Sequence, residues 1–196
     1  LSCGGDHSVS LPILRAVAKE SVAFIHIDAH TDTWDSFQGS KFNHGAPFRR
    51  AHEEGLIDPD KTVQIGIRGA QNVSEGWDYS KQAGMRVMFA EEVQERGTQA
   101  IIKETRAIIG DGPVYLSFDI DSIDPAFAPG TGTPEIAGLT TPEAMALIRG
   151  FRNLNYVGAD MVEVSPPFDV GGITSLTGAT VMYELLCILA ESISAR

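Results

Sequence analysis

Two short stretches of this 196-residue sequence carry closely spaced aspartates and histidines, side chains that bind divalent metal ions. The first contains Asp28, His30 and Asp32, and the second contains Asp119 and Asp121. A spacing of two residues places side chains on the same face of an extended strand, so each stretch can converge on one point. Several carboxylates held together repel one another unless cations neutralise them. A metal centre is therefore the chemistry that these residues indicate.

The composition of this set predicts how many ions it would hold. With His7 it comprises two histidines and four aspartates, and four carboxylate charges balance two divalent cations. Two metals roughly 3.5 to 4 Å apart are a known catalytic arrangement. Imidazole and carboxylate ligands without thiolate are typical of Mn, Fe, Ni or Zn. Calcium is disfavoured, because an EF-hand loop starting at Asp119 would have Asp124 in place of its glycine and Gly130 in place of its final glutamate.

Short apolar runs rich in Val, Ile and Phe alternate with segments of helical period, which predicts an α/β fold with a parallel sheet. We expect strands at 22–28, 63–67, 87–89, 114–119 and 156–164, and helices at 8–20, 47–54, 98–109, 141–149 and 176–191. Polar residues, among them Asp28, Asp119 and Glu163, come at strand ends, the edge where ligands bind. The last helix has apolar residues on most faces, so we expect it to be largely buried with Cys187 in the core.

The overall composition restricts the class of protein. Asp plus Glu number 26 against 15 Lys plus Arg, a net charge of -11, which argues against a nucleic-acid or anionic-membrane partner. No stretch approaches the ~18 uncharged apolar residues of a membrane span. The two cysteines, Cys3 and Cys187, lie near opposite ends and suit a reducing compartment, so we expect a cytoplasmic protein. The length favours a single domain over residues 1–196.

Five motifs make the sequence similar to the ureohydrolases, the arginase and agmatinase family: GGDHS from Gly4, DAHTDTWD from Asp28, NHGAPFRRA from Asn43, SFDIDSIDPAFAPGTGTPE from Ser117 and VEVSPP from Val162. The resemblance covers essentially the whole chain. It implies a three-layer α/β/α fold around a parallel sheet, with two Mn²⁺ ions at the carboxyl edge of the strands. The chain starts at the first ligand motif, without the family's N-terminal strands, so we interpret it as the C-terminal part of a longer ureohydrolase.

The resemblance also implies a division of the metal ligands between two sites. Matched motif by motif, one ion is bound by His7, Asp28, Asp32 and Asp119, and the other by Asp28, His30, Asp119 and Asp121. Asp28 and Asp119 would then bridge the two ions. Ni²⁺, Fe²⁺ or Co²⁺ are expected substitutes for manganese.

The catalytic roles follow from the same resemblance. A metal-bridging hydroxide would attack the guanidinium carbon, and the product would collapse to urea and an amine. Asp32 would accept a proton from the nucleophile, and His44 of the NHG motif would shuttle a proton at the leaving group. Glu163 would hold the guanidinium, whose planar fork a carboxylate matches. Thr133 of GTGTP would line the substrate pocket.

The substrate and the activity itself have alternatives at this stage. The motifs are closer to agmatinases and guanidinobutyrases than to arginases, so agmatine and 4-guanidinobutanoate are the candidate substrates. A carboxylate tail would need a partner such as Arg49, Arg50 or Arg68. The alternatives are a catalytically silent metal-binding homologue, an arginase or another guanidine or amidine hydrolase, and a deacetylase-type enzyme with one zinc. His44 and Glu163 favour the ureohydrolase, because metal binding alone does not require them.

Some expectations concern the assembly and the residues around the site. The family usually forms trimers or hexamers, so we expect a homo-oligomer. His26 is interpreted as a packed, hydrogen-bonded core histidine. Asp160 is either a substrate contact or a structural hydrogen-bonding residue, and Trp34 either lines the substrate mouth or covers the end of the sheet.

Overall fold

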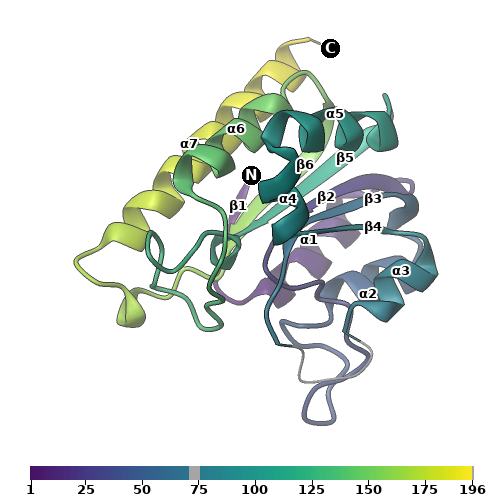
Figure 1. Ribbon diagram of the computed structural model, residues 1–196. Coiled ribbons are helices and arrows are strands. Elements are labelled where there is room, and N and C mark those ends of the chain that lie inside the picture. Colours follow the sequence, from purple (N-terminus) through teal and green to yellow (C-terminus); the bar gives the residue numbers. More distant parts are fainter. Residues whose placement is uncertain (71–75, 196) are drawn as a thin grey trace.

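The computed structural model describes residues 1–70 and 76–195 (Figure 1). In this part of the chain six strands form one parallel sheet in the order β1-β6-β5-β2-β3-β4. The strands are β1 (Ser2–Cys3), β2 (Val22–Ile27), β3 (Ile57–Ile67), β4 (Arg86–Phe89), β5 (Pro113–Asp119) and β6 (Asn155–Val162). The parallel sheet expected from the alternating pattern is confirmed.

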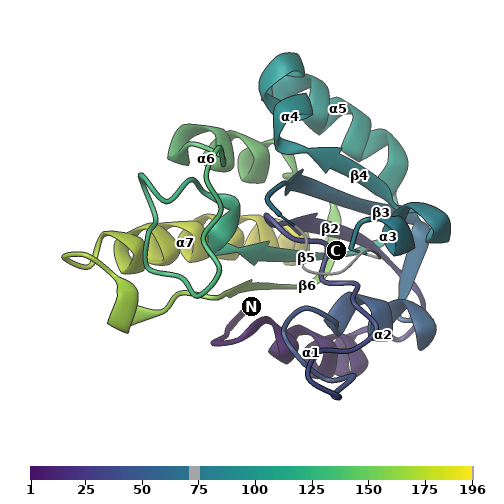
Figure 2. The same cartoon turned by 60° about the horizontal axis from the view of Figure 1, so that its bottom comes forward.

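Helices cover both faces of the sheet, as Figure 2 shows. They are α1 (Ser10–Val17), α2 (Pro47–Glu53), α3 (Asp78–Ala83), α4 (Ala90–Arg96), α5 (Thr98–Ile109), α6 (Thr141–Gly150) and α7 (Ile173–Ser194). The smaller hydrophobic core joins α1 and α2 to one face of the sheet, and the larger one joins α4, α5, α6 and α7 to the other. The three-layer α/β/α architecture is therefore confirmed.

The central strand β2 illustrates why this sequence forms a sheet buried on both faces. All six of its residues are buried, and their side chains alternate between the two cores. Ile25 and Ile27 enter the larger core, whereas Phe24 packs on Phe48 of α2 with ring centroids 4.5 Å apart. Asp28 directly follows the strand, so it emerges at the sheet edge between the two helical layers.

Several element boundaries differ from the sequence-based expectations. The helix expected at 8–20 is shorter, because its first turn is a separate 3-10 helix (His7–Val9) and the chain is extended at Ala18. Strand β3 begins six residues earlier than expected, since its polar first half hides the apolar pattern. Strand β1 and helices α3 and α4 were not expected, because two to seven residues are too few to show a clear period.

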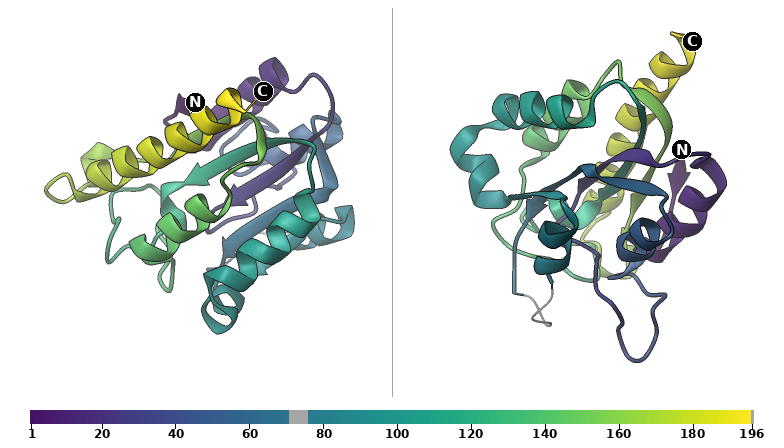
Figure 3. Two further views of the ribbon diagram at one scale, coloured as in Figure 1. Left: turned by 90° about the horizontal axis from the view of Figure 1, so that it is seen from above. Right: turned by 90° about the vertical axis from the view of Figure 1, so that its right-hand side faces the viewer.

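The expectation that the last helix is largely buried is wrong. Its inner face, including Val181 and Leu185, packs in the core, but large side chains on the opposite face are exposed: Leu176, Tyr183, Leu186 and Ile193. Cys187 is half-buried rather than a core residue. Helix α7 packs on β6 and α6, and within residues 1–70 and 76–195 its opposite side faces outward (Figure 3). When apolar residues surround a whole helix, the sequence does not indicate which face packs against the rest of the protein.

Helix α7 is also, among the described residues, the one helix long and apolar enough to cross a membrane by length and composition. A core helix of a globular protein passes the same test. Two glutamates interrupt its apolar run, and they form ion pairs with α6 and the turn after it: Glu184 with Arg149 and Glu191 with Arg152. These pairs hold α7 against its neighbour in the outer layer.

Candidate active site

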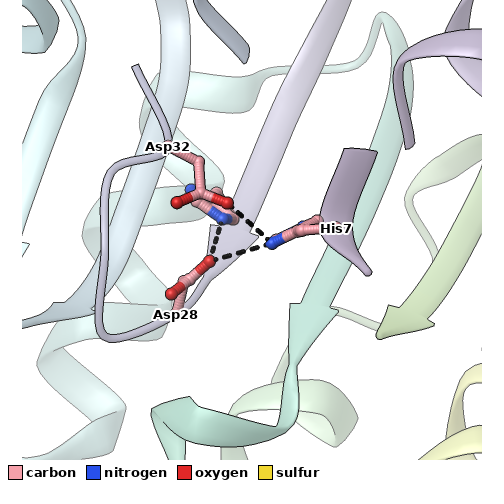
Figure 4. Close-up of side chains that lie close together, drawn as sticks. His7, Asp28 and Asp32 are labelled. Carbon is pink, nitrogen blue, oxygen red and sulfur yellow. Dashed lines mark hydrogen bonds and ion pairs between the residues drawn. The ribbon is translucent and has the colours of Figure 1, made fainter. Parts of the chain in front are cut away.

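His7 meets three aspartates at the carboxyl edge of the sheet. Its Nδ1 atom is 2.9 Å from Asp32 Oδ2, 3.1 Å from Asp119 Oδ2 and 3.3 Å from Asp28 Oδ2. Figure 4 shows the ring facing the carboxylates of Asp28 and Asp32. The ring is 1% exposed, and its Nδ1 has no hydrogen-bond partner of good geometry. A buried nitrogen aimed at three carboxylate oxygens fits a metal ligand.

A second group of ligands lies beside the first and shares Asp28 with it. His30 Nδ1 is 3.1 Å from Asp121 Oδ2 and 3.5 Å from Asp28 Oδ1. Asp119, at the end of β5, faces His7 through its Oδ2, while its Oδ1 accepts the backbone N–H of Asp121 at 2.8 Å. The structure thus brings all six expected ligands together, with Asp28 in the bridging place. How they divide between two ions stays a prediction.

The buried carboxylates of this cluster shift the pKa values of their histidine and aspartate neighbours. Burial disfavours a charged ring, but Asp121 and Asp28 outweigh it and raise the pKa of His30 to about 12. The pKa of His7 is also raised, because Asp119, Asp28 and Asp32 outweigh its burial. Burial and the neighbouring Asp121 and Asp28 raise the pKa of Asp119. The four buried aspartates thus favour positive charge beside them, and the donor set fits divalent ions.

A chain of hydroxyl groups orients the His7 ring from behind. His7 Nε2 is 2.8 Å from Ser117 Oγ, which donates to Asp160 Oδ1 at 2.6 Å. Ser10 and Tyr115 donate to the other oxygen of Asp160, at 2.7 and 2.5 Å. Because the Ser117 hydroxyl donates its hydrogen to Asp160, its oxygen accepts a hydrogen bond from His7 Nε2–H. The lone pair of His7 Nδ1 is then available to bind a metal. Asp160 is fully buried and therefore serves as a structural anchor, not a substrate contact.

Two site residues have left-handed backbone, which is unfavourable for residues other than glycine. The φ angles of Asp32 and Glu163 are 52° and 67°. Such conformations cost of order 1–3 kcal/mol and persist where the surroundings enforce them. For Glu163, the backbone N–H donates to Gly5 O at 2.8 Å and the Oε1 atom accepts the His7 N–H at 2.6 Å. These bonds tie the end of β6 to the segment that carries the first metal ligand.

Four of the expected metal ligands, His30, Asp32, Asp119 and Asp121, line a cleft with about 630 Å³ of empty space, part of it open to solvent. Its charged lining is acidic, and no Lys or Arg is among the described residues around it: His30, Asp32, Trp34, His44, Gly45, Ala70, Asp119, Asp121, Thr133, Pro134, Glu135 and Glu163. Trp34 lines this cleft, which agrees with the first of its two expected places. Its ring packs on Gly45, where an added Cβ would lie 2.7 Å from Trp34 Cε3. An acidic cleft of this kind favours a cationic group.

The three residues expected to handle substrate all line this cleft. Burial raises the pKa of Glu163 to about 7, although the His7 N–H stabilises its charge. His44 is about one third exposed, and its Nδ1 is 3.9 Å from Glu163 Oε1. Thr133 Oγ1 donates to Asp121 Oδ2 at 3.2 Å, so this threonine contacts a metal ligand as well as the cleft.

The arginines considered as partners for a substrate carboxylate are engaged elsewhere. Arg68 is buried, and its guanidinium donates to five backbone carbonyls, including those of Asp121 and Glu135. Arg50 pairs with Asp35 and Glu53. Arg49 lies over the Tyr79 ring, 4.3 Å from its centroid. None of the three lines the cleft.

Sequence reasoning missed residues that reach the site from other elements. Glu135 lines the cleft, with Oε1 3.9 Å from His30 Nε2, and it comes two residues after Thr133, at the end of the motif that starts at Ser117. Ser117 begins the SFDID motif and shares strand parity with Asp119, a signal that was available. Gln64 reaches His26 from the neighbouring strand, and no local pattern marks that contact.

Comparison with known proteins agrees with the motifs. The arginase family model matches residues 1–187. The chain belongs to the arginase family. A guanidinopropionase from Pseudomonas aeruginosa is 57% identical over 98% of this chain and 61% of its own length. A guanidinobutyrase from the same organism is 53% identical over 96% of this chain and 60% of its own length. A mitochondrial agmatinase from Gallus gallus is 52% identical over 96% of this chain and 56% of its own length.

Solved structures of arginase-family proteins share the fold. The proclavaminate amidino hydrolase from Streptomyces clavuligerus superposes with a TM-score of 0.93 at 46% identity, over 97% of this chain and 64% of that one. An arginase from Medicago truncatula superposes with a TM-score of 0.80 at 32% identity, over 94% and 57%. The expected family and fold are confirmed. This chain spans about 60% of the length of the curated relatives it matches.

Proposed function

We propose that this arginase-family protein hydrolyses a linear guanidino compound to urea and an amine, using two manganese ions. The observation that carries the proposal is the buried cluster of four aspartates and two histidines, four of which line an acidic cleft. The cluster contains no arginine or lysine of its own, so bound cations would balance it. The same cleft suits a substrate that is positively charged.

The chain offers oxygen and imidazole ligands, which suit manganese and related divalent metals. His7, Asp28, Asp32 and Asp119 would hold one ion, and His30 and Asp121 would complete the second site with Asp28 and Asp119. Two such ions supply a nucleophile from water at neutral pH and polarise the group under attack.

The remaining steps belong to protein side chains. Glu163 lies above the metal cluster and, as a carboxylate, binds the guanidinium through paired hydrogen bonds. Asp32 is 7% exposed and lines the cleft, where its carboxylate can accept a proton. His44 lies nearer solvent and delivers a proton to the leaving nitrogen. The walls formed by Trp34 and Pro134 limit access of water to these atoms.

The identity of the substrate tail depends on two opposing observations. Relatives named guanidinopropionase and guanidinobutyrase are among the most similar, which favours a guanidino acid. The described cleft lining has no lysine or arginine to bind a carboxylate, which favours agmatine and its ammonium tail. Backbone N–H groups are the alternative partners for a carboxylate.

The test is urea release by the Mn-loaded protein with agmatine, 4-guanidinobutanoate, 3-guanidinopropanoate and arginine assayed side by side. Turnover of one of them with two metals bound per chain supports the proposal and decides the tail. Two bound metals with no urea from any compound would support the catalytically silent homologue. One bound metal per chain would favour the deacetylase-type use of the fold. The homo-oligomer and the cytoplasmic location stay predictions, which size measurement and cell fractionation check.

A further inference from the structure

His26 is a fully buried histidine that is not among the proposed metal ligands or the groups that touch substrate. It lies on β2, two residues before Asp28 and on the same side of the strand. Its ring stacks on Phe24 with an interplanar angle of 17° and meets the edge of Phe48, with centroids 4.4 Å apart. The surrounding rings offer no strong hydrogen-bond partner, so both nitrogens of this buried imidazole need partners from other residues.

Each nitrogen of His26 has one such partner. Nε2 is 2.7 Å from Asp28 Oδ2, and Nδ1 is 3.1 Å from the side-chain nitrogen of Gln64. His26 and Gln64 face each other in the ladder between β2 and β3, so the register of the sheet builds this contact. The same Gln64 nitrogen donates to the backbone oxygen of Thr31 at 2.7 Å.

The Thr31 carbonyl decides how the amide and the imidazole are oriented. A carbonyl only accepts, so the Gln64 NH₂ group and not its oxygen must face it. That NH₂ group also faces His26 Nδ1, which must then carry a lone pair. The ring proton is on Nε2 and is donated to Asp28.

We infer that His26, with its tautomer set by Gln64, is a positioning residue for the bridging carboxylate of Asp28. One Asp28 oxygen accepts from His26, and the other accepts the His30 backbone N–H at 2.6 Å. With both oxygens held, their remaining lone pairs face His7 and His30, where the two metals would lie. This inference rests on the proposed metal site, and it adds to that site a residue that orients one of the metal ligands without binding the metal.

The alternative role for His26 is that of a metal ligand. Its nitrogen lies within 4.8 Å of ligand atoms of His7, Asp28 and Asp32. However, the nitrogen nearest the cluster carries the proton, because Gln64 occupies the lone pair of the other. A protonated nitrogen at 2.7 Å from a carboxylate oxygen is a hydrogen-bond donor. The geometry therefore assigns His26 to Asp28 and not to the ion.

Two substitutions separate the hydrogen bond from the packing of the ring. His26→Phe keeps an aromatic ring but removes the donor, whereas His26→Gln removes the ring but places an amide N–H near the position of Nε2. We expect His26→Phe to weaken Mn²⁺ binding about 10- to 100-fold in a calorimetric titration. His26→Gln should stay close to wild type. The inference is overturned if Phe binds manganese as wild type does, or if Gln loses as much affinity as Phe.

A second measurement covers the case in which a His26 variant fails to fold. Gln64→Met removes the donor that sets the tautomer, so it should weaken Mn²⁺ binding less than His26→Phe. It should also lower the thermal stability of the metal-free protein, because the buried Thr31 carbonyl loses its donor. Wild-type affinity in Gln64→Met would count against the inference. Failure of the wild-type protein itself to bind two metals would instead contradict the proposed function, so the two failures are distinguishable.

Discussion

The molecule contains two groups of charged side chains that differ in the ratio of positive to negative charges. The buried cluster consists of His7, Asp28, His30, Asp32, Asp119 and Asp121. The surface network joins β4, α4 and α5 through Arg86, Glu92, Arg96 and Glu104. The network pairs two arginines with two glutamates, all of them about one third exposed. The cluster has four carboxylates, and its histidines become positive only by binding protons.

This difference distinguishes a structural set of charges from a functional one. Exposed pairs of opposite sign are satisfied within the chain and contribute little. Buried charges of one sign are strongly unfavourable unless something outside the chain neutralises them. Substitutions in the network should therefore lower only the free energy of unfolding, and by little. Substitutions in the cluster should mainly weaken metal binding, and by much more.

The largest effect is expected from Asp119→Asn in the buried cluster. Loss of a carboxylate shared by both proposed metal sites should lower urea production by at least roughly a thousandfold, because bound metals supply several kcal/mol. The metal-free variant should be no less stable than wild type, since the pKa of Asp119 is raised by burial, Asp121 and Asp28. The number of metals bound per chain tests the loss of the metal sites, and thermal unfolding tests the stability. Binding of both metals by the variant would contradict the functional role assigned to the buried cluster.

Glu163→Gln tests whether the cleft needs a negative charge beyond those of the metal ligands. The amide keeps an acceptor for the His7 N–H but loses the charge that pairs with a guanidinium. We expect kcat/KM to fall about a hundredfold, the typical scale for truncating a buried charge pair. Mn²⁺ affinity should hardly change. A variant with a normal kcat/KM would remove Glu163 from the substrate site.

The pH dependence of metal binding sharpens the same comparison. Burial opposes positive charge on the two histidines, but the aspartates raise the pKa of His7 and raise that of His30 to about 12. The metal-free protein thus binds protons that the metal-loaded protein has released. Mn²⁺ affinity should rise with pH, by about tenfold per unit for each proton released. Titration calorimetry in buffers of different ionisation enthalpy counts those protons, and a count of zero would contradict the charge assignment.

Ser117→Ala tests the hydroxyl chain behind His7. Without Ser117 Oγ the ring loses its acceptor at Nε2, so Mn²⁺ affinity should fall about tenfold. Ser10→Ala is the matched control, because Ser10 donates to the same Asp160 but does not contact His7. If both variants lose the same affinity, Asp160 acts only through general packing.

The smallest effect is expected in the surface network. Glu104→Gln weakens ion pairs with Arg86 and Arg96, and it should lower the free energy of unfolding by less than about 1 kcal/mol. Added salt should shrink the difference further. Calorimetric Mn²⁺ titration should give the wild-type affinity. A large loss of metal binding here would show that the two charge groups are coupled.

Much of the site was predictable because it lies in local motifs. The spacing of Asp28, His30 and Asp32 is a property of one short segment, and so is that of Asp119 and Asp121. The alternating apolar runs likewise predicted five of the six strands. The outer face of α7 was not predictable, since residues such as Leu186 and Ile193 have the same chemistry as those that pack inside.

The sequence by itself determined the kinds of ligand, their spacing, their excess of negative charge and the parallel sheet that carries them. Only the tertiary structure decided that β2 lies between β5 and β3, which brings Asp28 beside Asp121 and places Gln64 opposite His26. Such contacts join segments tens of residues apart, and they depend on strand order and register. Local periodicity carries no information about either, because every buried parallel strand shows the same apolar pattern.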